Sequence, residues 1–199
     1  MPNWCSNQLT VSGPRKDVKD FQRKAKGCGA RYNSASDSPT WEMHDDIRVW
    51  ALFQDAPDDD GDEQVLCFHR LYPVPSDFRR FPYDDGQARK VGEACDEPRP
   101  YGGYTWQSKH WGTKWDACES YLDHEDANTL VYAFETAWGP PVELFEKVAK
   151  DFPSLTFELS YEEGGMGFAG YNTWELGECS AEDAWDIEWD EKEGEWNRA

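Results

Sequence analysis

The clearest hydrophobic pattern lies in the second half of the chain. Residues 114–122 and 129–137 form two strand-like segments, the second rich in β-branched and aromatic residues, and a polar loop at 123–128 joins them. Such a pair is typical of a β-hairpin. Pro140 and Pro141 follow, and Val142, Phe145 and Val148 then recur three apart. Residues 141–152 are therefore expected to form an amphipathic helix.

Similar patterns flank this hairpin. Residues 3–13 alternate at Leu9 and Val11 and end at Gly13, which predicts a strand. Residues 15–26 place Val18, Phe21 and Ala25 on one helical face. Alternation over 155–161 predicts another strand, and 166–176 is expected to return beside it after a turn.

The segment between the first helix and the hairpin is less regular. Residues 32–40 read as a loop, 47–53 as a strand or short helix, 55–63 as a solvated acidic loop, and 65–72 as a short apolar strand. Residues 86–94 and 101–111 favour short helices, the second ended by Gly112. After Ser180 the chain is mostly acidic residues and tryptophan, and a helix there would place Trp185 and Trp189 on one face.

The predicted order is β-α, an insertion at about residues 29–112, β-β-α-β, and one added strand. This order predicts an α+β fold, in which two helices cover one face of an antiparallel sheet. We expect a domain over residues 1–179 and an acidic, tryptophan-rich tail over 180–199.

Composition and charge narrow the choice of partners. Eleven tryptophans, ten phenylalanines and nine tyrosines can supply a core in this chain of 199 residues. The net charge of −20 disfavours direct binding to nucleic acid or to an anionic membrane. Such a charge has several explanations: a basic partner, a bound metal, adaptation to salt, or simple solubility. A sharper hypothesis is that the surface mimics nucleic acid.

The six cysteines are scattered and include no CxxC pair, and the start of the chain resembles no signal peptide. We therefore expect free thiols in the cytoplasm. No phosphate-binding loop, dinucleotide fingerprint or common hydrolase motif is present, so we expect no cofactor. Cys95, His110, Cys118 and His124 are of zinc-ligand type, but their spacing matches no compact zinc module, and no metal is expected.

Four motifs carry a resemblance to a known family: MPNWCSN, LYPVPSDF, WGTKWDA and FETAWGPP. In this order they resemble the YubB ferredoxin-like domain family of phage and plasmid proteins, over residues 1 to about 177. The resemblance implies a ferredoxin-like sandwich with an inserted subdomain, and a mobile-element origin. It brings no catalytic residues.

Two clusters have residue types suited to binding. The denser one is His110, Trp111, Thr113, Lys114, Trp115 and Asp116. It could stack a ring and hold an anion, or the tryptophans could anchor the insertion while Lys114 pairs with Asp116. Glu162 and Glu163 could be paired carboxylates, although a solvated hairpin tip explains them better. Cys118 could be a nucleophile, but a buried thiol is the simpler reading.

We therefore expect a non-catalytic accessory protein of a phage or plasmid that binds a host protein in the host cytoplasm. The partner would be basic, such as a nucleic-acid-binding defence component. It would contact acidic surface near the hairpin tip and the tail, including Trp185 and Trp189. The alternatives are a small-ligand binder or novel enzyme with its site around residues 110–116, and a structural interaction domain whose acidity serves solubility.

Overall fold

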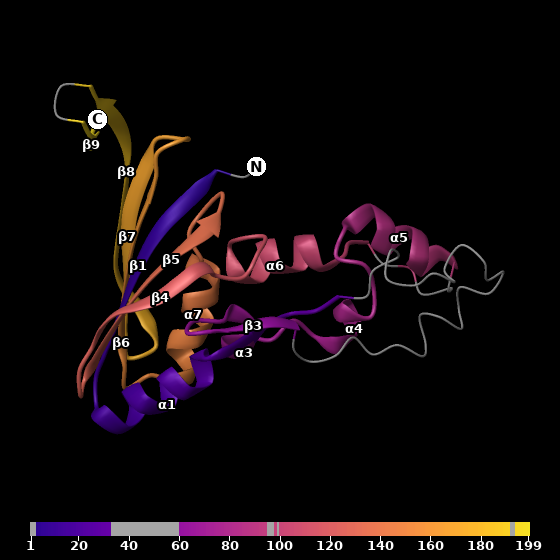
Figure 1. Ribbon diagram of the computed structural model, residues 1–199, viewed down its shortest axis with the longest axis horizontal. Helices are drawn as coiled ribbons and strands as arrows, with labels where there is room; N and C mark the ends of the chain where they lie inside the picture. Colours follow the sequence, from indigo (N-terminus) through magenta and orange to yellow (C-terminus); the bar gives the residue numbers. More distant parts are fainter. Residues whose placement is uncertain (1–2, 33–59, 95–97, 99, 192–193) are drawn as a thin grey trace.

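The centre of the molecule is an antiparallel sheet with the strand order β4-β5-β1-β6-β7-β8-β9 (Figure 1). The computed structural model describes residues 3–32, 60–94, 98, 100–191 and 194–199. The strands of this sheet are β1 (Trp4–Ser12), β4 (Cys118–Glu125), β5 (Thr129–Ala137), β6 (Thr156–Glu163), β7 (Phe168–Glu175), β8 (Glu178–Asp190) and β9 (Glu195–Arg198).

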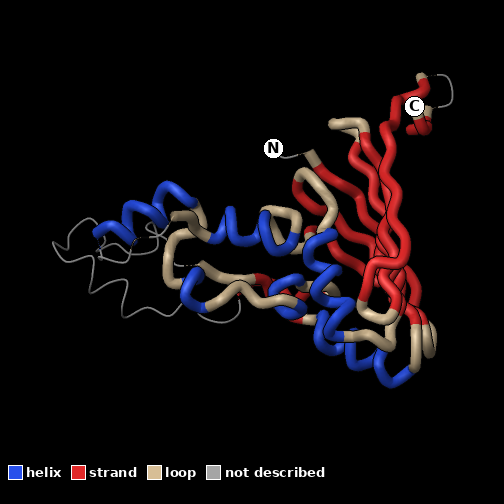
Figure 2. The backbone as a smooth tube through the Cα atoms, turned by 180° about the vertical axis from the view of Figure 1, so that it is seen from behind, coloured by secondary structure: helices blue, strands red, loops and turns tan. Residues whose placement is uncertain are grey.

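Two main helices, α1 (Arg15–Ala25) and α7 (Val142–Asp151), lie on the same side of this sheet. Figure 2 shows from behind that the other described helices lie on that side too. The order β1-α1-β4-β5-α7-β6 is the βαββαβ arrangement of a ferredoxin-like fold. The predicted α+β sandwich, with helices on one face of an antiparallel sheet, is confirmed.

Strict alternation in β1 explains the two faces of the sheet. Cys5, Asn7, Leu9 and Val11 are buried beneath the helices, whereas the residues between them face the other way. Neighbouring strands match this pattern, since Leu9 pairs with Tyr132 of β5 and with Leu159 of β6. These side chains pack against the apolar stripes of α1 and α7, and the core includes Phe21, Phe145, Phe157 and Trp174.

The predicted insertion leaves the sheet on its helical side (Figure 1). It contains β3 (Asp60–Gln64), which pairs with β2 (Gly27–Gly29), and the helices α3 (Phe68–Leu71), α4 (Ser76–Arg79), α5 (Asp85–Ala94) and α6 (Gly103–Trp111). Leu66, Phe68 and Trp106 join the same apolar core as the sheet. The insertion is thus packed onto the helical layer and leaves the opposite face of the sheet uncovered by described helices.

Most predicted elements are confirmed, including α5, and α6 with its left-handed Gly112 at φ 84°. Residues 65–72 are a correction, because they contain the short helix α3 where a strand was expected. Residues 60–63 of the predicted acidic loop belong to strand β3. The expectations for 47–53 and for the rest of that loop lie outside the described residues.

The predicted tail helix is wrong. Residues 178–190 form β8, which pairs with β7 from Glu178 to Asp186, and its last residues pair with β9. The segment forms a strand for two reasons. Its apolar residues recur every second position, at Trp185, Ile187 and Trp189, which is the period of a strand face. The edge of β7 also supplies backbone hydrogen-bond partners. The division into a domain of residues 1–179 and a tail of 180–199 stays a prediction.

Candidate functional site

The segment from His110 to Asp116 does not form one surface. Trp111 is fully buried, with its indole N–H donating to the carbonyl of Tyr72 at 3.0 Å. Its ring packs edge-on against Phe68 and Trp106. Trp111 therefore anchors the insertion to the core, as the structural reading of this cluster expected.

Asp116 also serves the fold. Its carboxylate accepts hydrogen bonds from the backbone N–H groups of Phe68 at 2.6 Å and His69 at 3.1 Å. It thereby fixes the first turn of α3. Burial raises the pKa of Asp116, and the hydrogen bonds from these amides oppose that shift. The predicted pairing of Lys114 with Asp116 is wrong, because the two side chains have different neighbours.

His110 lies between aromatic rings at the end of α6. Its ring centroid is 4.5 Å from that of Trp106 and 6.1 Å from that of Tyr72. Burial lowers the pKa of His110, and the nearby ammonium groups of Lys147 and Lys109 lower it further. A neutral imidazole packed against aromatic rings is a structural contact rather than a candidate acid.

Lys114 and Trp115, which precede β4, instead join a surface group with Trp4 of β1 and Trp138, which follows β5. The Lys114 ammonium lies 4.4 Å from the centroid of the Trp115 ring and 5.0 Å from that of Trp138, which are cation–π distances. Trp115 also packs against Trp4 at 5.9 Å. Trp4 is 43% exposed and Trp138 is 53% exposed. We call Trp4, Lys114, Trp115 and Trp138 the tryptophan cluster.

A cleft of about 320 Å³ opens beside this cluster, lined by Trp4, Ser6, Cys118, Glu119 and Glu135. Ser6 donates its hydroxyl to Glu135 Oε1 at 2.8 Å. The other oxygen, Oε2, is buried and has no hydrogen-bond partner within the described part of the chain. The cleft thus offers aromatic surface beside a carboxylate, one oxygen of which has no hydrogen-bond partner among the described residues.

The thiol in this cleft is poorly suited to nucleophilic chemistry. Burial raises the pKa of Cys118, and the carboxylates of Asp116, Glu119 and Glu135 raise it further. Since the thiolate is the reactive form, Cys118 is held in its unreactive state at neutral pH.

The cleft belongs to a larger surface, which we call the acidic–aromatic face. It is the side of the sheet without described helices. The strand registers define two rows across it. The first row is Cys118, Glu135, Ser6, Glu162, Ala169 and Trp185; the second is Tyr121, Ala133, Gln8, Ser160, Tyr171 and Asp183.

A shallow depression of about 480 Å³ lies at the middle of this face. Tyr171 and Trp185 border it, with ring centroids 6.4 Å apart. The Arg198 guanidinium lies over the Trp185 ring at 4.9 Å and 3.6 Å from Asp183. An arginine of this chain therefore already shows how a cation fits between an aromatic ring and a carboxylate here.

Glu162 and Glu163 point to opposite sides of the sheet. Glu162 is exposed on the acidic–aromatic face, whereas Glu163 is 1% exposed. The Glu163 carboxylate accepts hydrogen bonds from the backbone N–H groups of Gly165, at 3.1 Å, and Met166. The prediction of a solvated hairpin tip is wrong for Glu163, which holds the turn between β6 and β7.

The two predicted tail tryptophans differ in their surroundings. Trp185 is half-buried beside Tyr171 on the acidic–aromatic face. Trp189 is 51% exposed and packs edge-on against Trp196 of β9 at 5.4 Å. Of the predicted site residues, the structure therefore brings only Glu162 and Trp185 into the two rows, with Lys114 and Trp115 at their margin.

Sequence reasoning missed Ser6, Glu135 and Tyr171. The signal was present, because each occupies the outward position of an alternating strand. What was lacking was the strand order and register, which bring those outward positions side by side into a continuous surface.

Among the described residues, no group of three His, Cys, Asp or Glu side chains could hold a metal ion. Cys95, one of the four considered zinc-ligand types, lies outside them. Within the same described ranges, no helix has the length and apolar character needed to cross a membrane.

Comparison with known proteins agrees with the fold. Residues 114–199 match the family model described as the ferredoxin-like domain in Api92-like protein, so the match extends through β9. No curated protein matches the sequence. The crystal structure of protein api92 from Yersinia pseudotuberculosis superposes with a TM-score of 0.59 at 11% identity, over 92% of this chain and 98% of that one. The chain therefore has a ferredoxin-like fold similar to that of the api92 protein.

Proposed function

We propose that this is a non-catalytic binding protein, which holds a basic partner protein against its acidic–aromatic face. One observation carries the proposal: exposed rings and carboxylates share a sheet face that no described helix covers. Large aromatic side chains beside carboxylates suit arginine and lysine, which bind through cation–π contacts and charge-assisted hydrogen bonds.

The cleft beside the tryptophan cluster fits the same partner chemistry. Glu135 Oε2 is buried without a hydrogen-bond partner among the described residues, next to the half-exposed ring of Trp4. An arginine side chain placed there would donate to the free oxygen and stack on the indole. Arg198, held between Trp185 and Asp183, makes the equivalent contacts within the chain.

The net charge of the chain also favours a basic partner, because it attracts positive charge at long range. The net charge of −20 would accelerate association with a basic protein. This acceleration would weaken as salt screens the charges. We further propose that the partner is a nucleic-acid-binding host protein, for which this surface substitutes for nucleic acid. The similarity of the four sequence motifs to the YubB family supports a phage or plasmid origin and action in the host cytoplasm.

The test is affinity capture from host lysate at low and high salt, followed by a binding isotherm with the purified partner. The informative variant is Glu135→Gln with Glu162→Gln, which removes two charges from the acidic–aromatic face. Its matched control is Glu143→Gln with Glu146→Gln, which removes two exposed charges from α7 on the other side of the sheet.

We expect the face variant to weaken binding by about tenfold or more, since two charge-assisted contacts are reduced, while the control binds like the natural protein. DNA or RNA should compete with the protein for a nucleic-acid-binding partner. Affinity that stays constant from low to high salt would contradict the proposal. Equal loss in both variants would show that only total charge matters and would contradict a specific role of this face.

The fold roles of three residues weigh against the alternative of a small-ligand or catalytic site around residues 110–116. Trp111 and Asp116 are engaged in the packing of the insertion, and His110 lies among aromatic rings.

A further inference from the structure

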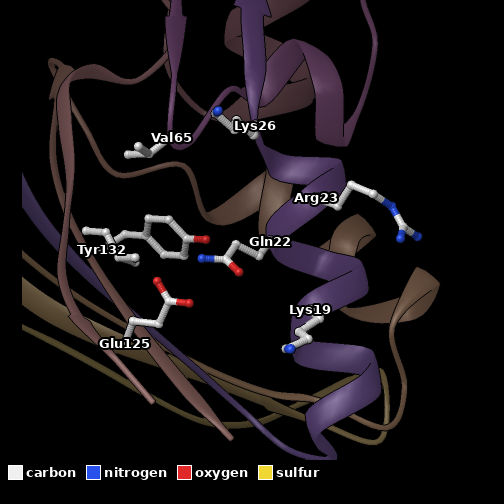
Figure 3. Close-up of a pocket in the computed structure, with 8 residues that line it drawn as sticks. Lys19, Gln22, Arg23, Lys26, Val65, Glu125 and Tyr132 are labelled. Carbon is white, nitrogen blue, oxygen red and sulfur yellow. The ribbon is translucent and has the colours of Figure 1, made fainter. Parts of the chain in front are cut away.

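A third hollow lies on the opposite side of the sheet, between α1 and the β4–β5 edge (Figure 3). Its volume is about 600 Å³. Its lining residues come from three parts of the chain: Lys19, Gln22, Arg23 and Lys26 from or just after α1, Val65 after β3, and Leu122, Glu125 and Tyr132 from the hairpin. We call it the α1 pocket.

The hydroxyl of Tyr132 is the most informative group in this pocket. The residue is 1% exposed, yet its hydroxyl has no hydrogen-bond partner among the described residues. Figure 3 shows it pointing across the pocket toward Gln22. Buried polar groups are nearly always paired. Since burial also raises the pKa of Tyr132, the hydroxyl keeps its proton and can donate it in a hydrogen bond.

The charge around this hydroxyl is opposite to that of the chain as a whole. Between Arg15 and Lys26 the sequence carries six basic and two acidic residues, in a protein of net charge −20. Arg23 is bound to Asp20 at 2.8 Å and Lys26 to Glu63 at 2.7 Å. No described acidic group forms an ion pair with Lys19, which projects from α1 on the opposite side of the pocket from Glu125 (Figure 3).

We propose that the α1 pocket binds a small organic phosphate monoester. Its anionic group would accept hydrogen bonds from the Tyr132 hydroxyl and from Lys19, with Gln22 between them. Val65 and Leu122 supply apolar contact for the body of the ligand. Glu125 faces the same space, so the ligand also carries a hydroxyl or amino group that donates to this carboxylate.

Calorimetric titration with glycerol phosphate and with inorganic phosphate, at constant ionic strength, tests the proposal. Tyr132→Phe removes one oxygen atom, and Lys19→Gln removes one charge. Lys16→Gln is the control, because Lys16 is exposed on the same helix but does not line the pocket. Saturable binding is expected for the natural protein and the control. Tyr132→Phe should weaken it about tenfold, and Lys19→Gln several-fold.

Thermal unfolding separates a ligand contact from a structural one. Because the hydroxyl has no partner in the described residues, Tyr132→Phe should melt no lower than the natural protein while binding the anion more weakly. Equal affinity of the natural protein and Tyr132→Phe would overturn the proposal, as would the absence of saturable heat for both probes up to about 10 mM. A clearly lower melting temperature of Tyr132→Phe would overturn it too, since the hydroxyl would then be satisfied within the fold.

Discussion

The two faces of the sheet use the same kinds of residue for different purposes. On the helical face Phe21, Tyr132 and Phe157 pack into the core, with edge-to-face ring contacts of 5.4 to 6.2 Å. On the other face Trp4, Tyr121 and Tyr171 remain exposed, with carboxylates between them. An aromatic-rich sequence therefore indicates a binding surface only once it is known which side of the sheet the helices cover.

The largest contrast is expected between two tryptophans. Trp111→Ala should lower the free energy of unfolding by about 3–5 kcal/mol, because it empties a fully buried site. Trp4→Ala should change it by less than about 1 kcal/mol but weaken partner binding. Urea unfolding of both variants measures the contrast, and similar losses of stability would erase the distinction between the faces.

The second largest loss of stability is expected on substitution of Asp116. Asp116→Ala leaves the backbone N–H groups of Phe68 and His69 without their acceptor, and we expect a loss of about 2–3 kcal/mol. Asp123→Ala on exposed strand β4 is the matched control and should change stability by less than about 0.5 kcal/mol. Equal stability of the two variants in urea would show that Asp116 does not hold α3.

Glu162 and Glu163 compare the two faces at adjacent positions. Glu163→Ala should cost about 1–2 kcal/mol, because the β6–β7 turn loses its buried acceptor. Glu162→Ala should leave stability within about 0.5 kcal/mol and act only on partner binding. Thermal unfolding of both variants distinguishes the roles, and a reversed order of melting temperatures would refute the assignment.

The smallest expected effect is the pH dependence from His110. Its pKa in the fold is below the ordinary value of 6.5, so the unfolded chain takes up the proton first as pH falls. Stability should therefore decline as pH drops below about 6.5, and His110→Gln should flatten this decline. Unfolding midpoints between about pH 5.5 and 7.5 measure it; an unchanged slope in the variant would assign the effect elsewhere.

Local patterns predicted the sheet and its helices well. The spacing of Val18, Phe21 and Ala25 specifies α1 because one face must be buried, and the alternation around Leu9 specifies β1 for the same reason. The tail was mistaken for a helix because Trp185 and Trp189, four apart, satisfy both periods. Ile187 between them, buried at 6% exposure, distinguishes the strand.

The rest depended on contacts between distant residues. Helix α3 has its first turn fixed by Asp116, which lies 48 positions after Phe68. Likewise the acidic–aromatic face gathers single outward residues from several strands, whereas the predicted cluster was a run of sequence neighbours. Adjacent residues such as Glu162 and Glu163 separate to opposite sides, so proximity in sequence misled the site prediction.

The added strand β8 has a consequence for self-association. Between Glu178 and Asp186 it pairs with β7 on one side, and no described strand pairs with its other side. An open strand edge invites another chain to add to the sheet. Here that edge carries Glu178, Glu182, Asp183 and Asp186, so two copies meeting edge to edge would bring like charges together. The negative charge thus protects the protein from polymerising through its own backbone.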